Sequence, residues 1–123
     1  MTALDQVAAQ LRTAFDEHDL TLFGMLLADD VWWGDGLRPQ RCRGRSDVLA
    51  TFGRLVGQSV DTNVSDIIVG RVGILAVMQA RWADARETRN ETALYHAYSI
   101  RGSLITGISR YEDLDAALDA IGA

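Results

Sequence analysis

The chain has 123 residues, of which 48% are hydrophobic and 24% charged, and its formal net charge is −5. These values predict one globular domain, residues 1–123, with enough apolar material for its own core. No apolar run approaches the roughly 18 residues of a membrane span, and the negative charge disfavours nonspecific nucleic-acid binding, so we expect neither partner.

The residue types narrow the possible chemistry further. Every cationic side chain is an arginine, so a Schiff-base lysine and a phosphate-loop lysine are both excluded. A single cysteine, Cys42, cannot form an internal disulfide, and together with two histidines it disfavours a structural zinc site. We therefore predict no metal and no cofactor. The start of the chain lacks a signal-peptide pattern, and we expect a cytoplasmic protein.

Helical spacing of apolar residues dominates the first part of the chain. It predicts one helix from about Ala3 to Glu17, capped by Thr2, and a second, well-buried helix from roughly Leu20 to Ala28. The two are separated by a break at His18-Asp19, where we expect a solvated histidine.

The segment ADDVWWGDGLRPQRCRGR, from Ala28 to Arg45, follows these helices. It predicts a short strand at Val31–Trp33, then Asp35 on a glycine-flanked bend, then an edge strand at Arg41–Arg45 with its arginines on one face. A third helix, capped by Ser46, should run through Gly57.

From there the apolar period changes to two, which is typical of strands. The predicted strands are Asn63–Val69, Ile74–Trp82, Thr88–Ile100 and Leu104–Tyr111, and a short helix starts near Asp113. Three helices before an antiparallel meander predict an α+β fold. We expect a curved antiparallel sheet wrapped as a cone around the three N-terminal helices, with a short C-terminal helix.

Three segments resemble the nuclear transport factor two-like superfamily, in particular its SnoaL-like and ketosteroid-isomerase-like branches. They read FDEHDLTLFGMLLADDVWW, CRGRSDVLATFGRL and RGSLITGISRYED, and the resemblance extends over nearly the whole chain. It implies the same cone-shaped fold that the periodicity predicts independently. Because this fold hosts isomerases, cyclases, dehydratases and plain binding modules, the site has to be argued from residues.

The resemblance also assigns positions. Asp35 stands where ketosteroid isomerases carry their catalytic base, and His96 stands near their second, hydrogen-bond-donating acid. Phe52 and Tyr111 stand where the family has a tyrosine and a pocket-lining tryptophan. The main departure is Leu11, which replaces the tyrosine of the oxyanion hole and leaves His96 as the main donor.

Strand alternation predicts which side chains face the inside of the cone. Asp35 and His96 are the proposed catalytic acid and imidazole, because a carboxylate in an apolar cavity gains basicity and an imidazole can donate to an oxygen across it. The other residues predicted to contact a ligand are mostly apolar. They are Leu11, Phe15, Trp33, Phe52, Met78, Trp82, Tyr98, Ser109 and Tyr111.

Two readings without catalysis stay open. In one, the protein only binds a small molecule. In the other it is a dimeric accessory module whose cavity is filled by its own side chains, namely Phe15, Trp33, Phe52, Met78 and Trp82. The enzymatic reading is a cofactor-independent isomerase, cyclase or dehydratase acting on an apolar carbonyl compound. Cys42 is more typical of a small packed residue than of a nucleophile.

Two surfaces complete the predictions. Arg38, Arg41, Arg43 and Arg45 form a local basic patch, which is either a solvated rim or an attraction for a weakly anionic ligand. The outer sheet face mixes aromatic, small and arginine residues, as a protein contact does. The resemblance implies a sheet-to-sheet homodimer at that face.

Overall fold

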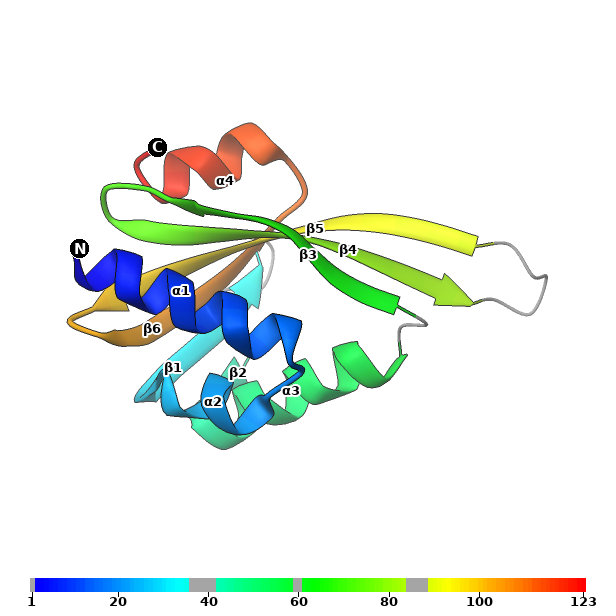
Figure 1. The fold of residues 1–123 in the computed structure, drawn as a ribbon, viewed down its shortest axis with the longest axis horizontal. Coiled ribbons are helices and arrows are strands. Elements are labelled where there is room, and N and C mark those ends of the chain that lie inside the picture. Colours follow the sequence, from blue (N-terminus) through cyan, green and yellow to red (C-terminus); the bar gives the residue numbers. More distant parts are fainter. Residues whose placement is uncertain (1, 36–41, 59–60, 84–88) are drawn as a thin grey trace.

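The computed structural model describes residues 2–35, 42–58, 61–83 and 89–123 (Figure 1), with side chains for all of these except 35, 54–58, 61–63, 80–83 and 89–92. In chain order the elements are α1 (Ala3–Asp16), α2 (Leu20–Met25), β1 (Leu27–Asp35), β2 (Cys42–Arg43), α3 (Arg45–Gln58), β3 (Asp61–Val69), β4 (Gly73–Ala83), β5 (Arg89–Arg101), β6 (Leu104–Tyr111) and α4 (Leu114–Ala120). None of the helices in these ranges is long and apolar enough to cross a membrane.

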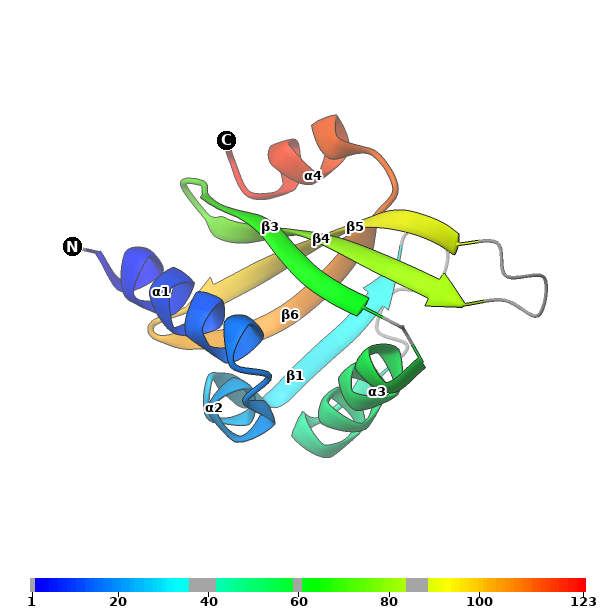
Figure 2. The same cartoon turned by 45° about the vertical axis from the view of Figure 1, so that its right-hand side comes forward.

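The strands form one six-stranded sheet in the order β2-β1-β6-β5-β4-β3. Figure 1 shows α1, α2 and α3 on one side of this curved sheet and α4 on the other, and Figure 2 shows β3 and β4 arching over the space that α1 and α3 border. The predicted α+β cone is therefore confirmed. The sheet is mixed rather than wholly antiparallel as predicted, because β1 runs in the same direction as its neighbour β6 and pairs parallel with it.

β1 begins four residues earlier than the predicted Val31, at Leu27. The cause lies far along the chain. The Ile105 amide donates to the Leu26 carbonyl at 2.7 Å, and the Arg45 guanidinium donates to the Leu27 carbonyl at 2.9 Å. Arg45 also pairs with Asp29 at 2.9 Å, so this arginine of the predicted basic patch ties the start of α3 to the start of β1.

Local sequence explains how the helices start and end. At α1, the Thr2 hydroxyl accepts from the Asp5 amide and the Asp5 carboxylate accepts from the Thr2 amide, which is a capping box. At α2, the Asp19 carboxylate accepts from the Leu22 amide at 3.0 Å. Gly24 lets α2 approach α3, since a Cβ there would sit 3.1 Å from the Leu49 side chain.

The sheet separates two hydrophobic clusters. The inner cluster lies between the sheet and α1–α3 and includes Val7, Leu11, Phe23, Ile74 and Tyr98. The outer cluster lies between the sheet and α4 and consists of Leu75, Ala97, Ala117 and Ile121, with partly buried residues around them. Each face of β4 and β5 is therefore covered by a different set of helices, and α4 occupies part of the face predicted for a homodimer.

A β-bulge in β6 reverses part of the predicted alternation. Ile105 pairs with Ile100, but Gly107 pairs with Ser99, so one extra residue, Thr106, stands between the two pairs. As a result Ile105 and Ile108, three positions apart, both lie in the inner cluster. The rest of β6 is shifted by one face, a change that period-two counting cannot detect.

Candidate functional site

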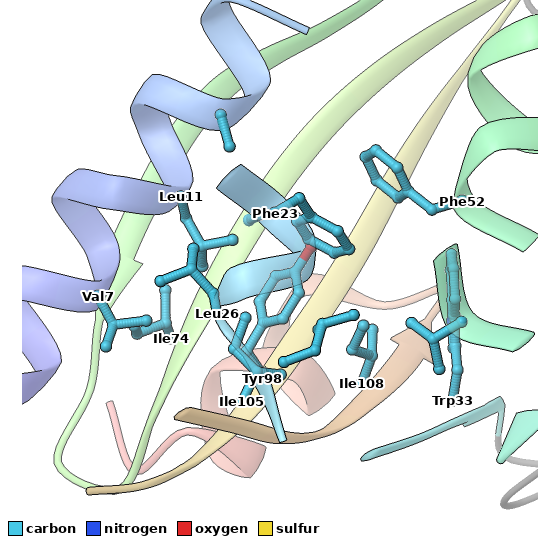
Figure 3. Packing of buried hydrophobic residues seen from close by; sticks show 14 of the residues in the cluster. Val7, Leu11, Phe23, Leu26, Trp33, Phe52, Ile74, Tyr98, Ile105 and Ile108 are labelled. Atoms are coloured by element: carbon cyan, nitrogen blue, oxygen red, sulfur yellow. The ribbon is translucent and has the colours of Figure 1, made fainter. Parts of the chain in front are cut away.

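Two polar residues of β5 lie inside the cone. His96 and Tyr98 are alternate residues and are each 1% exposed. Tyr98 is opposite Ile74 on one side and Ile108 on the other, which places it among the inner apolar side chains. In Figure 3 the Tyr98 ring extends from β5 toward Phe23 of α2. The prediction that His96 and Tyr98 face inward is confirmed.

Each of these two residues has one buried polar atom that is unsatisfied within the described part of the chain. Neither the Nδ1 atom of His96 nor the hydroxyl of Tyr98 has a hydrogen-bond partner among the described residues. A buried polar group without a partner costs about 1–3 kcal/mol of folding free energy, so two such atoms on one strand need an explanation. One explanation is a ligand that supplies the missing partner.

Burial fixes the protonation of both groups. Desolvation lowers the pKa of His96 to about 4, with a smaller contribution from the Arg110 cation, and desolvation raises the pKa of the Tyr98 hydroxyl. At neutral pH the imidazole is therefore uncharged and the phenol protonated. Such a pair can donate to a neutral carbonyl or hydroxyl oxygen, and the imidazole can also accept from a hydroxyl.

Aromatic rings connect this pair to the helices. The Trp33 ring stands edge-on to His96 with centroids 5.3 Å apart, and Phe52 lies 6.4 Å from Trp33. Phe23 is stacked on Phe52 at 4.5 Å, and Phe15 is tilted against both. These rings form a connected aromatic cluster that runs from His96 of β5 to Phe15 of α1.

A pocket opens beyond these rings, at the junction of α1 and α2. Its free volume is about 80 Å³, enough for two or three waters or part of a small ligand. The lining is apolar apart from one imidazole and one carboxylate. It consists of Ala14, Phe15, His18, Asp19, Leu20, Phe23, Phe52, Val64 and Met78.

The predicted contact residues divide into groups. Phe15, Phe52 and Met78 line the pocket, while Leu11 and Trp33 are packed in the inner cluster beside it. The inward placement of Ser109 and Tyr111 was wrong. Beyond the bulge Ser109 is opposite Ala97 and Tyr111 is opposite Tyr95, and Tyr111 packs against the outer cluster with α4.

Asp35 and Trp82 are placed only by their backbone, since their side chains lie outside the described part of the chain. Asp35 ends β1 and is opposite Arg110 of β6, and Arg110 is in turn opposite His96 of β5. Paired residues of neighbouring strands share a face, so the register is compatible with a common row. That Asp35 and His96 face one cavity remains a prediction, as does the role of Trp82.

Sequence reasoning missed part of the pocket wall. Phe23 and Val64 line the pocket but are not among the predicted contact residues, and His18 was expected to be only solvated. His18 is exposed, as expected, and yet it borders the pocket. The sequence signal that could have indicated this role was a histidine at the end of a helix, a position where glycine is common.

Other chemistry-bearing residues do not gather at this site. The Cys42 sulfur lies 3.1 Å from the Thr51 hydroxyl, and the Thr51 hydroxyl also donates to the Asp47 carbonyl. Within the described ranges, no three histidine, cysteine, aspartate or glutamate side chains come close enough to hold a metal ion. Arg38 and Arg41 of the predicted basic patch lie outside those ranges.

Solved structures with the same architecture place the fold. A putative SnoaL-like polyketide cyclase from Jannaschia sp. CCS1 has a TM-score of 0.74 at 12% identity, over 100% of this chain and 96% of that one. The fold is nuclear transport factor two-like. A nuclear transport factor two-like protein of unknown function from Burkholderia pseudomallei has a TM-score of 0.69 at 17% identity, over 100% of both chains.

A third structure of this nuclear transport factor two-like fold contains a bound molecule. It is a Mycobacterium tuberculosis protein in complex with estradiol-17beta-hemisuccinate, with a TM-score of 0.66 at 17% identity, over 94% of this chain and 97% of that one. No family model and no curated protein matches the chain. Identities this low support the common fold and leave the function to be argued from the site.

Proposed function

We propose that the protein binds a small, mainly apolar molecule whose single inner oxygen, a carbonyl or hydroxyl, reaches Tyr98 and His96. The observation that carries this proposal is a pair of buried polar atoms that have no partner among the described residues and lie among apolar side chains. An interior selected for packing alone would gain stability by replacing them with apolar groups. A ligand oxygen that satisfies both atoms explains why they are present.

The route to the pair runs through the aromatic residues. Phe23 and Phe52 line the pocket, and the Trp33 ring neighbours both Phe52 and His96. A ligand entering at the α1–α2 junction would therefore displace or stack on these rings, which bind flat apolar molecules well. A mycobacterial protein of this fold has been solved in complex with estradiol-17beta-hemisuccinate, which supports a ligand-binding role for the architecture.

Binding is tested with a matched pair of probes, 4-phenylbutan-2-one and butylbenzene, which differ by one carbonyl oxygen. We expect Tyr98→Phe to lower the affinity for the ketone about tenfold and to leave butylbenzene unchanged, because one neutral hydrogen bond is lost. The measurement is a titration followed by NMR chemical shifts. The same substitution should raise the free energy of unfolding by about 1 kcal/mol, since it removes an unsatisfied hydroxyl.

Tyr98→Phe should thus lower the affinity for the ketone and raise the free energy of unfolding, and this combination separates a ligand role of the hydroxyl from a packing role. A Tyr98→Phe protein that is destabilised, with ketone binding intact, would show that the hydroxyl serves the fold. Wild-type protein that binds neither probe would overturn the proposed function.

A second candidate function is catalysis at the same oxygen, and the register row of Asp35, Arg110 and His96 favours it. In this scheme the Asp35 carboxylate takes a proton from the carbon beside the carbonyl. The electron pair of that C–H bond forms a C=C bond to the carbonyl carbon, and the C=O π pair moves to the oxygen, where neutral His96 and Tyr98 stabilise the enolate by donating hydrogen bonds. In a substrate with a C=C bond next to the deprotonated carbon, return of the proton to the far carbon of that bond completes an isomerisation without a cofactor.

Deuterium exchange tests this step without knowledge of the natural substrate. Wild-type protein in D2O should accelerate loss of the protons beside the carbonyl of 4-phenylbutan-2-one, and Asp35→Asn should abolish that acceleration while keeping the ketone affinity. Exchange at the buffer rate with wild-type protein, alongside intact binding, would reject catalysis and keep the binding function.

A further inference from the structure

The break between α1 and α2 contains an unusual backbone conformation. His18 has φ of 52° and is the only non-glycine residue in the described ranges with positive φ. The Asp19 amide donates to the Ala14 carbonyl at 2.8 Å and the His18 amide to the Phe15 carbonyl at 3.3 Å. These bonds define a Schellman turn, in which the residue at the position of His18 is usually glycine. The chain therefore has a side chain at position 18, where glycine would relieve the strain of the left-handed backbone.

That side chain borders the pocket. His18 and Asp19 are the polar residues of the lining, and the Asp19 carboxylate already accepts from the Leu22 amide. The described contacts include no hydrogen bond or ion pair to the His18 ring. The imidazole is therefore the polar group at the pocket mouth that remains available for a ligand.

The charges around the mouth restrict what this group can bind. Asp16, Glu17 and Asp19 flank His18 in sequence, and Arg12 is directed to Asp16 by an i,i+4 ion pair of 3.5 Å. Carboxylates so close by disfavour an anionic ligand group. A neutral hydroxyl can both donate to and accept from an imidazole without meeting that repulsion.

We propose that His18 determines specificity at the pocket mouth by hydrogen bonding a neutral hydroxyl at the outer end of the ligand. The proposal rests on the proposed binding function and adds a second polar contact at the opposite end of the molecule. It explains why the strained position holds a histidine, since glycine would fit the turn better and bind nothing.

The test compares 4-(4-hydroxyphenyl)butan-2-one with 4-phenylbutan-2-one, which lacks the outer hydroxyl. Wild-type protein should bind the hydroxylated ketone about five- to tenfold more tightly, as one added hydrogen bond gives. His18→Gly and His18→Ala should both remove this preference. His18→Asn, which tolerates the turn and keeps a polar group, should retain part of it.

Thermal stability separates the ligand role from a structural one. His18→Gly should raise Tm by about 3–5 °C through relief of the left-handed backbone, whereas His18→Ala should not raise it. The ring protons of His18 should shift in NMR spectra when the hydroxylated ketone is added. Equal loss of preference in two variants of different stability cannot come from a general loss of folding.

Several outcomes would overturn the proposal. It fails if wild-type protein binds both ketones equally, if His18→Gly or His18→Ala keeps the full preference for the hydroxylated ketone, or if His18→Gly gains no stability. In each of these cases 4-phenylbutan-2-one still binds and the proposed function stands. If wild-type protein binds neither ketone, both proposals fail together.

Discussion

The two faces of the sheet solve the packing problem differently. On the outer face α4 packs on Leu75 and Ala97, and the buried residues of that cluster within the described ranges are all aliphatic. On the inner face His96 and Tyr98 keep polar atoms that have no partner among the described residues, and a pocket remains open at the α1–α2 junction. The outer face reaches the close packing that stability favours. The inner face departs from it in two independent ways, which indicates selection for something besides stability.

The largest expected effect is on the outer face. At Gly70 an added Cβ would overlap the carbonyl oxygen of Ile121, which also accepts from the Val72 amide at 3.0 Å. Gly70→Ala should therefore displace the end of α4 and lower the free energy of unfolding by about 3 kcal/mol, measured by urea denaturation.

The matched control for Gly70→Ala is Gly53→Ala in α3, where a Cβ would meet no described heavy atom within 4 Å. Alanine has a higher helix propensity than glycine, so the free energy of unfolding of this control should rise by about 0.5–1 kcal/mol. If Gly70→Ala were as stable as wild-type protein, the outer face would be loosely packed, and the contrast between the two faces would disappear.

The next effect belongs to the inner face and depends on pH. Burial lowers the pKa of His96 from its usual 6.5 to about 4, with Arg110 contributing less. Between these values the unfolded chain binds a proton that the folded chain does not. Stability is thus full above about pH 6.5 and falls as the pH drops. We expect a loss of about 2 kcal/mol between pH 7.5 and pH 5 from this group, measured by urea denaturation.

His96→Phe provides the comparison for that pH effect. It removes the titrating group and leaves His18 in both proteins, so the difference between the two curves isolates His96. The variant should lose much less stability than wild-type protein over the same interval. Parallel curves for the two proteins would mean that His96 takes up its proton in the folded state as easily as in the unfolded one.

The contrast between the faces also shows what sequence could predict. Local periodicity predicts α1, α3 and β5, the elements that carry Leu11, Phe52 and the pair His96 and Tyr98. The parallel pairing of β1 depends on a distant segment that includes Ile105, and the bulge at Thr106 depends on how β6 pairs with β5. Local sequence patterns predict neither.

The site was predicted less completely than the fold. His96 and Tyr98 were placed inside correctly because β5 is regular up to them. Ser109 was misplaced by the bulge, and the pocket at His18 depends on how two helices meet, which a single sequence does not specify. The role of Asp35, the homodimer and the cellular location stay predictions.

The smallest effect is the sharpest test of the comparison, because it adds the same kind of group to each face. Val64 lines the pocket, so Val64→Ile places one methylene in existing free volume and should change the free energy of unfolding by less than about 0.5 kcal/mol. Ala117 is fully buried in the outer cluster, and Ala117→Val should cost about 1–3 kcal/mol there. Val64→Ile should nevertheless weaken binding of 4-phenylbutan-2-one, because it occupies the volume that the ligand needs. If both variants lose the same stability, the pocket is as closely packed as the outer face and is no binding site.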